Sequence, residues 1–128
     1  MREGNYGVVL NNRRTLMVKK KDFYIFPGGK IEENENFKKC LEREFSQELS
    51  GTQIEVGEFY KDFSGVGPIS EQEILCHHYF CRIVGPLKEG SSEISEKKYV
   101  NSKNMSELNV SNISKKVLIS LINDNLID

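Results

Sequence analysis

The alternation of apolar and polar residues predicts a chain built mainly from short strands. Strand-like runs occupy residues 6–10, 15–19, 23–26, 54–63, 73–84 and 99–100. The polar residues at 11–14 predict a hairpin turn, because asparagine tolerates a positive φ angle. Segments 64–70 and 87–98 are rich in glycine, serine or charged residues, so we expect loops there. Gly57 interrupts its strand and predicts a β-bulge.

Two segments follow the period of a helix. The first runs from about residue 36 to about residue 50 and stops at Gly51. The second begins near residue 112 and carries an apolar stripe. That stripe consists of Ile113, Val117, Leu118, Leu121, Ile122 and Leu126. Because the 73–84 strand is apolar on both faces, we expect one sheet between helices, in a single domain spanning residues 1–128.

Three polar side chains of the first helix lie in or beside its apolar face. That face is made of Phe37, Cys40, Leu41, Phe45 and Leu49. At about 100° per residue, Glu44 and Glu48 fall inside the apolar sector and Gln47 borders it. A buried carboxylate is unfavourable unless it is paired or bound to a cation. The placement of these acids is therefore the main indication of function.

The spacing of these residues suits a cation. Positions i, i+3 and i+4 make Glu44, Gln47 and Glu48 neighbours on one surface. Two close carboxylates repel each other unless a cation lies between them, and oxygen donors suit Mg²⁺ or Mn²⁺. Arg43 is placed to orient Glu44 through a bidentate contact. The alternative is a solvated acidic helix end without a ligand, and this helix alone favours neither interpretation.

A glycine-rich segment precedes the helix. Gly28 and Gly29 predict a turn that lets the backbone approach a ligand and offers it a carbonyl or an amide. Beside carboxylates, such a turn fits a metal-bound phosphate ester, although Gly-Gly-Lys alone also describes a plain turn. Lys30 and the lysines at 19–21 are either phosphate contacts or ordinary surface charge.

Composition and charge exclude several classes of protein. The net charge of −1 provides no broad basic field for nucleic acid. No apolar run approaches the roughly 18 residues of a membrane span, and the first residues lack a secretory signal. The three cysteines, Cys40, Cys76 and Cys81, lack zinc spacing and predict reduced thiols in the core. We therefore expect a cytoplasmic protein with a small-molecule ligand and neither a nucleic-acid nor a membrane partner.

Residues 29–51 resemble the Nudix box, G-x5-E-x7-R-E-U-x-E-E-x-G-U, in which U is aliphatic. Gly29, Glu35, Arg43, Glu44 and Glu48 stand at matching positions. The strands around the box and the terminal helix agree with the family more loosely. The resemblance implies an α/β fold, a Nudix-like α/β/α sandwich with a mixed β-sheet between helices.

The resemblance also implies an enzyme, a metal-dependent pyrophosphohydrolase that acts on an acid anhydride of a nucleotide and uses Mg²⁺ or Mn²⁺. In the family's pattern Glu44 is a metal ligand or general base, and Arg43 orients it. The remaining implied site residues are Glu48, Gln47 and the carbonyl of Gly29 as metal ligands, Gly28 and Lys30 at the substrate, Glu35 in support of the loop and helix, and Glu93 or Glu96 as a further acid.

Three positions depart from the box. Gln47 replaces the first acid of the Glu-Glu pair, and its amide oxygen lacks charge and cannot act as a base. Ser50 replaces the box glycine while Gly51 follows, so we expect the helix to end one residue further on. Phe45 is bulkier than an aliphatic residue, which we interpret as a packing difference.

Three functions remain open at this point. The expected substrate is a (deoxy)nucleoside triphosphate, a nucleoside diphosphate linked to another group. ADP-ribose or another nucleotide sugar is the alternative, with Pro68 in the loop after the box as a slight indication. In a different class, Gln47 would mark a nucleotide-binding module with little turnover. His77 and His78 either contact a base or ribose or belong to the strand core. We expect a monomer or a homodimer.

Overall fold

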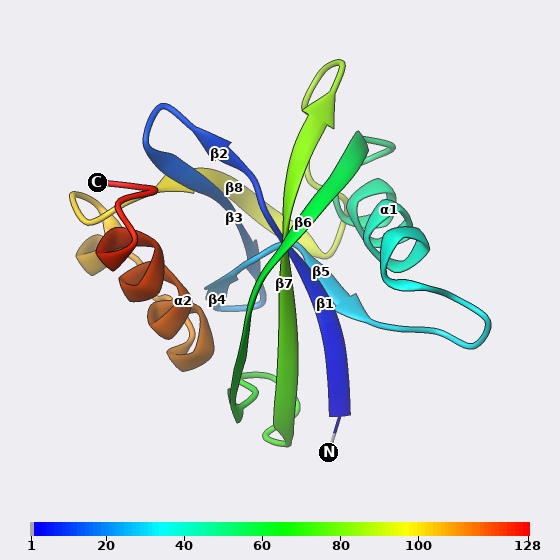
Figure 1. The fold of residues 1–128 in the computed structure, drawn as a ribbon, viewed down its shortest axis with the longest axis horizontal. Helices are drawn as coiled ribbons and strands as arrows, with labels where there is room; N and C mark the ends of the chain where they lie inside the picture. Colours follow the sequence, from blue (N-terminus) through cyan, green and yellow to red (C-terminus); the bar gives the residue numbers. More distant parts are fainter. Residues whose placement is uncertain (1) are drawn as a thin grey trace.

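The computed structural model describes residues 2–128. Along the chain its elements are β1 (Arg2–Val8), β2 (Leu10–Asn11), β3 (Arg14–Lys20), β4 (Phe23–Ile25), β5 (Gly28–Lys30), α1 (Phe37–Glu48), β6 (Gln53–Val66), β7 (Glu73–Val84), β8 (Ile94–Val100), the 3-10 helix η1 (Met105–Glu107) and α2 (Asn112–Asn123). Figure 1 shows α1 and α2 on opposite sides of the strands.

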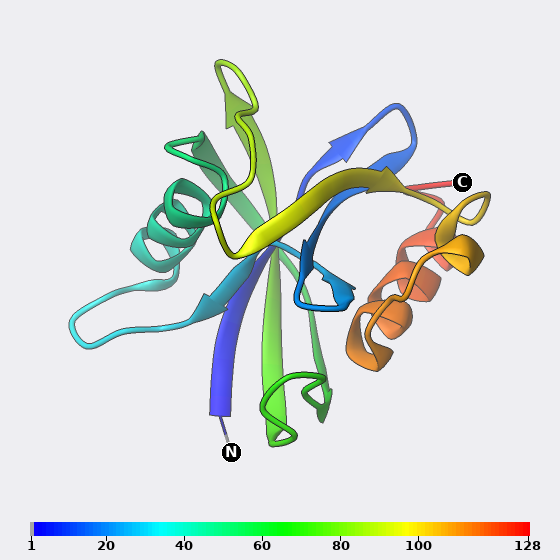
Figure 2. The same cartoon turned by 180° about the vertical axis from the view of Figure 1, so that it is seen from behind.

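The strands form two sheets rather than the single sheet that the sequence predicts. One sheet has the order β5-β1-β7-β6, and the other has the order β2-β3-β4 with β8 paired to β3. In the first sheet β1 runs parallel to β7, whereas β5 and β6 are antiparallel to their neighbours. The view from behind shows β8 crossing over β3 (Figure 2). The predicted fold class is confirmed, because the β5-β1-β7-β6 sheet is mixed and the strands lie between the two helices (Figure 1), whereas the expected number of sheets was wrong.

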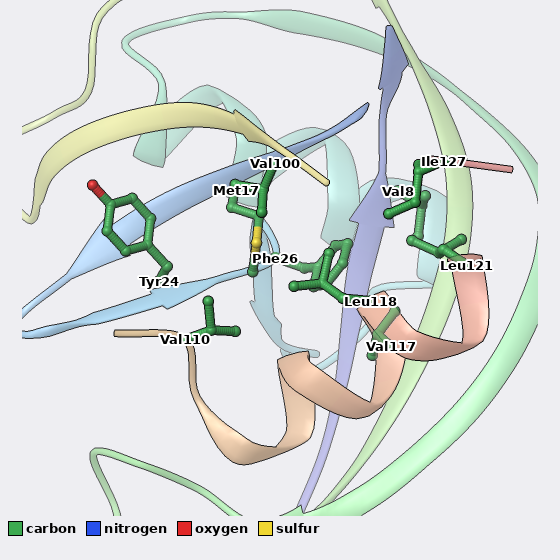
Figure 3. Packing of buried hydrophobic residues seen from close by; sticks show 10 residues of the cluster. All are labelled: Val8, Met17, Tyr24, Phe26, Val100, Val110, Val117, Leu118, Leu121 and Ile127. Carbon is green, nitrogen blue, oxygen red and sulfur yellow. The ribbon is translucent and has the colours of Figure 1, made fainter. Parts of the chain in front are cut away.

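Two apolar layers hold the helices, because successive residues of a strand point to opposite faces. In β3, Met17 packs in the layer with α2, and the next residue, Val18, packs in the layer with α1. Figure 3 shows the layer with α2, which contains Val8, Met17, Tyr24, Phe26, Val100, Val110, Val117, Leu118, Leu121 and Ile127. In the other layer a Cβ on Gly7 would lie 2.6 Å from the ring of Phe45. The glycine therefore accommodates the bulky residue, which fits the interpretation of Phe45 as a packing difference.

Several predicted boundaries were wrong, because pairing with distant strands outweighed local composition. The polar segment before residue 99 is strand from Ile94 onward, where β8 pairs with β3. β6 continues to Val66 instead of ending at residue 63, because it follows β7. Gly28 and Gly29 belong to strand β5, paired with β1, and not to a turn. The bulge predicted at Gly57 is confirmed by a register shift between Val56 and Phe59.

Helix α1 is capped at both ends by local hydrogen bonds. The amide of Lys39 donates to Oδ1 of Asn36 over 2.9 Å, which fixes the start. At the end, the amide of Gly51 donates back to the carbonyl of Ser46 over 2.7 Å, while Ser50 takes a left-handed φ of 48°. The helix therefore ends at Glu48, and the expectation that it continues one residue further was wrong. Ser50 therefore occupies a left-handed conformation that glycine adopts more readily.

The left-handed Ser50 leads to a prediction about stability. We expect Ser50→Gly to stabilise the protein by about 0.5–1 kcal/mol, because glycine adopts this φ without steric strain. Urea unfolding of both proteins measures the difference. Ser46→Gly is the control: it places glycine inside the same helix and should destabilise by a similar amount. A Ser50→Gly protein that is no more stable than the wild type would contradict the prediction.

The three cysteines, Cys40, Cys76 and Cys81, are free and buried, as predicted. Burial raises the pKa of each thiol, which disfavours the reactive thiolate.

Within residues 2–128, no helix has the length and apolar character needed to cross a membrane.

Candidate active site

Glu44 lies against the backbone of β5. A Cβ on Gly29 would be 2.8 Å from the carboxyl carbon of Glu44 and 2.8 Å from its Oε2. Only glycine leaves this space free, so the second glycine of the segment is explained by the carboxylate that packs on it. The sequence placed Glu44 and Gly29 in the same site, and the structure brings them into contact.

Glu48, one turn later, is almost completely buried, with 3% of its surface exposed. Its Oε1 accepts a hydrogen bond from the amide of Gly28 over 3.1 Å, while Oε2 has no hydrogen-bond partner within residues 2–128. Burial, together with the negative charge of Glu44, raises the pKa of Glu48 to about 8. The raised pKa favours the protonated form of Glu48 when no cation is bound.

Arg43 joins three parts of the site with one guanidinium group. Its Nε and Nη2 donate to the two carboxylate oxygens of Glu35 over 2.6 and 3.0 Å. Its Nη1 donates to Oε1 of Glu44 over 2.7 Å, and Nη2 also donates to the carbonyl of Lys30 over 3.0 Å. The hydrogen bond from Arg43 lowers the pKa of Glu35. Arg43 thus fixes Glu44 to the segment that follows β5.

Gln47 lies at the edge of this arrangement. It is exposed, and its Oε1 accepts a hydrogen bond from Nη1 of Arg43 over 3.1 Å. The amide oxygen therefore binds a cationic side chain instead of turning towards Glu48. Glu44 and Glu48 therefore face the glycine strand, which is β5, whereas the uncharged Gln47 lies at the edge of the site.

Gly28 and Lys30 differ from their predicted roles at the substrate. The amide of Gly28 is occupied by Glu48, and a φ of 143° brings the backbone close to β1. Lys30 is exposed, and its carbonyl accepts from Arg43. In the structure both residues support the carboxylates through their backbones.

The structure separates the two candidates for a further acid. Glu96 on β8 is bonded to the hydroxyl of Tyr24. Glu93 lies 3.5 Å from Nζ of Lys20, and the charges of both residues act on Glu48. The loop that carries Glu93 is tied to α1, because the amide of Ser91 donates to the carbonyl of Glu48 over 2.8 Å. Glu93 is therefore the acid that the fold brings near the carboxylate pair.

Nothing in the sequence pairs Lys20 or Tyr24 with these acids. Lys20 is one of three neighbouring lysines that fit either phosphate contacts or surface charge, and Tyr24 belongs to a short apolar strand. Their contacts arise because β3 pairs with both β4 and β8, which brings together residues more than 70 positions apart.

The donor set fits a hard divalent cation. Glu44 packs against Gly29, Glu48 accepts from the amide of Gly28, and Oε2 of Glu48 is buried without a hydrogen-bond donor. A buried, partnerless carboxylate oxygen beside a second carboxylate is a place where a cation removes an electrostatic penalty. No group of three or more histidine, cysteine or acidic side chains within residues 2–128 is arranged to hold a metal. Mg²⁺ commonly needs only one or two carboxylates plus substrate phosphates.

Comparison with solved structures gives the same fold. The chain is 17% identical to the MutT protein from Methanosarcina mazei Go1, with a TM-score of 0.78 and coverage of 97% of this chain and 94% of that one. The chain is 15% identical to an ADP-ribose pyrophosphatase from Streptococcus suis 89-1591, with a TM-score of 0.69, and the alignment covers 97% of this chain and 90% of that one. A UDP-X diphosphatase is 14% identical with a TM-score of 0.75, and the alignment covers 97% of this chain but 64% of that protein.

Sequence comparison identifies the family directly. A search of curated proteins gave no match. A family model described as the NUDIX domain matches residues 1–121, which is nearly the whole chain and includes the box with its three departures. The chain therefore belongs to the Nudix family.

Proposed function

We propose that this Nudix protein hydrolyses the pyrophosphate bond of a nucleoside diphosphate linked to another group, with Mg²⁺ or Mn²⁺ as cofactor. A (deoxy)nucleoside triphosphate is the first expected substrate. The observation that carries the proposal is the pair Glu44 and Glu48, one helical turn apart, directed at the glycine strand β5 with one buried carboxylate oxygen left partnerless.

Glu44, Glu48 and the carbonyl of Gly29 would hold the cation. Once bound, it would neutralise negative charge on the phosphate oxygens as the phosphorus–oxygen bond breaks. Glu48 would hold the cation as a charged carboxylate, because metal ligands must be deprotonated and a cation would offset the burial that raises the pKa of Glu48. Gln47 contributes at most a neutral oxygen.

The remaining steps belong to side chains of the chain itself. Water attacks one phosphorus atom, one of its protons passes to a carboxylate, and the bridging oxygen leaves with the other phosphate. Glu44 is the proposed acceptor of that proton, since Arg43 holds its carboxylate at a defined position 2.7 Å away. Glu93 is the second candidate, because its loop is anchored to the end of α1.

Two alternatives each have an observation in their favour. For ADP-ribose or another nucleotide sugar, the support is Pro68, which lines a cavity beside β5, and the names of two structural neighbours. For a nucleotide-binding module with little turnover, the support is Gln47, whose amide oxygen is already bound by Arg43.

A hydrolysis assay separates these functions. The panel contains the ribo- and deoxyribonucleoside triphosphates, ADP-ribose and a UDP-sugar, each with Mg²⁺, with Mn²⁺ and with EDTA. The proposal expects turnover of at least one triphosphate with a divalent cation and none with EDTA. Turnover of nucleotide sugars alone would favour the first alternative. Nucleotide binding without turnover of any compound would overturn the enzyme assignment.

Gln47 supplies a more specific prediction. We expect Gln47→Glu to lower the Mg²⁺ concentration needed for half-maximal activity by about tenfold, because a third carboxylate strengthens the attraction to the cation. A Mg²⁺ titration of the hydrolysis rate measures this. Ser46→Glu adds the same charge at an exposed position of α1 and serves as the control. Equal shifts in both variants would mean that only the total charge matters.

A further inference from the structure

A cavity of about 160 Å³ shares a wall with the carboxylate pair. Gly28 and Gly29 line this cavity, and the same two residues contact Glu48 and Glu44. The other walls come from β1, β7, the loop between β6 and β7, and the start of α2. A molecule held at the carboxylates can therefore extend past the glycine strand into this space.

Three of the residues that line the cavity, Tyr6, Phe26 and His78, carry rings. The ring of His78 stacks on Tyr6 with centroids 5.5 Å apart, and the ring of Phe26 meets it edge-on at 5.4 Å. Phe63, outside the lining, also meets the ring of His78 edge-on at 5.4 Å. A void of about 150 Å³ lined by apolar side chains is enough to hold a benzene ring. The described lining residues include two cations, Arg2 and Lys20, and no acid. The cavity therefore suits a flat, uncharged ring attached to an anionic group.

The imidazole ring of His78 has a defined hydrogen-bonding role. Its Nδ1 lies 3.3 Å from the carbonyl of Cys76, and a carbonyl only accepts, so Nδ1 carries the proton. The ring is 2% exposed, and burial lowers its pKa to about 4, which keeps it neutral. Nε2 is then an acceptor, and the hydrogen bond from Nδ1 to Cys76 leaves it available to a ligand.

We propose that His78 is a specificity-determining residue, which accepts a hydrogen bond from an N–H group of a nucleotide base that lies in this cavity. The inference rests on the proposed function for the position of the phosphates. A base without an N–H group would cover Nε2 and leave it without a donor. Because a buried polar atom that loses its partner is strongly disfavoured, we expect discrimination of about tenfold or more.

Matched pairs of nucleotides test this inference by binding alone. Adenosine monophosphate and purine riboside monophosphate differ by one amino group, and uridine and 3-methyluridine monophosphates differ in one ring N–H. Isothermal titration calorimetry in EDTA measures the four affinities without turnover. We expect the donor-bearing member of at least one pair to bind about tenfold more tightly.

Variants assign the effect to His78. His78→Leu should bring that ratio close to one, and His78→Gln, which keeps an acceptor oxygen, should restore part of it. His77→Gln is the matched control, because the neighbouring histidine faces the other side of β7, where it contacts Asp62 and Glu3, and should keep the wild-type ratio. The inference is overturned if no nucleotide binds, if both wild-type ratios are close to one, or if His78→Leu retains the discrimination.

Two outcomes separate this inference from the proposed function. Hydrolysis without discrimination within either pair overturns the role of His78 and leaves the enzyme assignment intact. Discrimination without hydrolysis of any nucleotide supports the role of His78 and overturns the enzyme assignment. If His78→Leu does not fold, His78→Gln decides: a ratio lower than in the wild type supports the role of His78, and an unchanged ratio overturns it.

Discussion

Replacing Glu48 by glutamine should lower the rate of hydrolysis by at least about 100-fold and should also stabilise the metal-free protein at alkaline pH. The loss of activity follows from the loss of a charged metal ligand, since removal of even a supporting group of a metal site costs about 10–100-fold. The gain in stability follows from the burial of Glu48, whose Oε2 has no hydrogen-bond partner within residues 2–128. Replacing a residue that stabilises the fold would lower the stability of the protein, so a loss of activity together with a gain in stability indicates a functional residue.

The direction of the pH effect follows from the pKa of Glu48. Folding raises it from an ordinary value of 4.5 to about 8, so the folded protein binds more protons than the unfolded chain between these two values. The free energy of unfolding of the wild type therefore falls as the pH rises through this window, and the full penalty is present above it. At about 1.4 kcal/mol per pKa unit, that penalty is a few kcal/mol. Glutamine cannot ionise, so the variant avoids this penalty.

Urea unfolding at pH 5, 7 and 9, in EDTA and in Mg²⁺, measures this effect. We expect the advantage of Glu48→Gln over the wild type to grow with pH in EDTA and to shrink in Mg²⁺, because a bound cation stabilises the charged form of Glu48. Glu42→Gln is the control, since Glu42 is an exposed acid on the same helix. A stability difference that is independent of pH, or an active Glu48→Gln enzyme, would contradict the assignment.

Alanine at the two neighbouring glycines should damage the protein in different ways. At Gly29 the three atoms nearest to a new Cβ all belong to the carboxyl group of Glu44, the closest 2.8 Å away, and a flexible side chain can move aside. We therefore expect Gly29→Ala to fold with nearly the wild-type stability and to lose at least about 100-fold in kcat, because Glu44 leaves its position on Arg43.

At Gly28 the obstacle is the backbone. A Cβ there would lie 2.2 Å from the carbonyl oxygen of Asn5 and 2.7 Å from the Cα of Tyr6, at a φ of 143°. We expect Gly28→Ala to destabilise the protein by about 3 kcal/mol or more, since neither strand can move without breaking the β1–β5 pairing. Urea unfolding combined with kcat and KM distinguishes the two variants. A fully active Gly29→Ala enzyme would show that the position of Glu44 against the strand is unimportant.

The sequence determined the parts of this site that depend on local geometry. The spacing of Glu44 and Glu48 places them on one face of a helix whatever surrounds it, and the cap at Asn36 needs only neighbouring residues. The same helical period predicted that both acids lie in an apolar sector. The structure confirms this for Glu48, which is buried. The departures of Gln47 and Ser50 from the box were also visible in the sequence.

The tertiary structure alone decided what depends on contacts between distant residues. It showed that Oε2 of Glu48 lacks a hydrogen-bond partner within residues 2–128 and that Gln47 turns to Arg43. It also separated Glu93 from Glu96, because the partners Lys20 and Tyr24 reach these acids only when β3 pairs with β8. Strand pairing and burial are properties of the whole fold, whereas the period of a helix belongs to the local chain, and this is why the sequence named the carboxylates but did not define their surroundings.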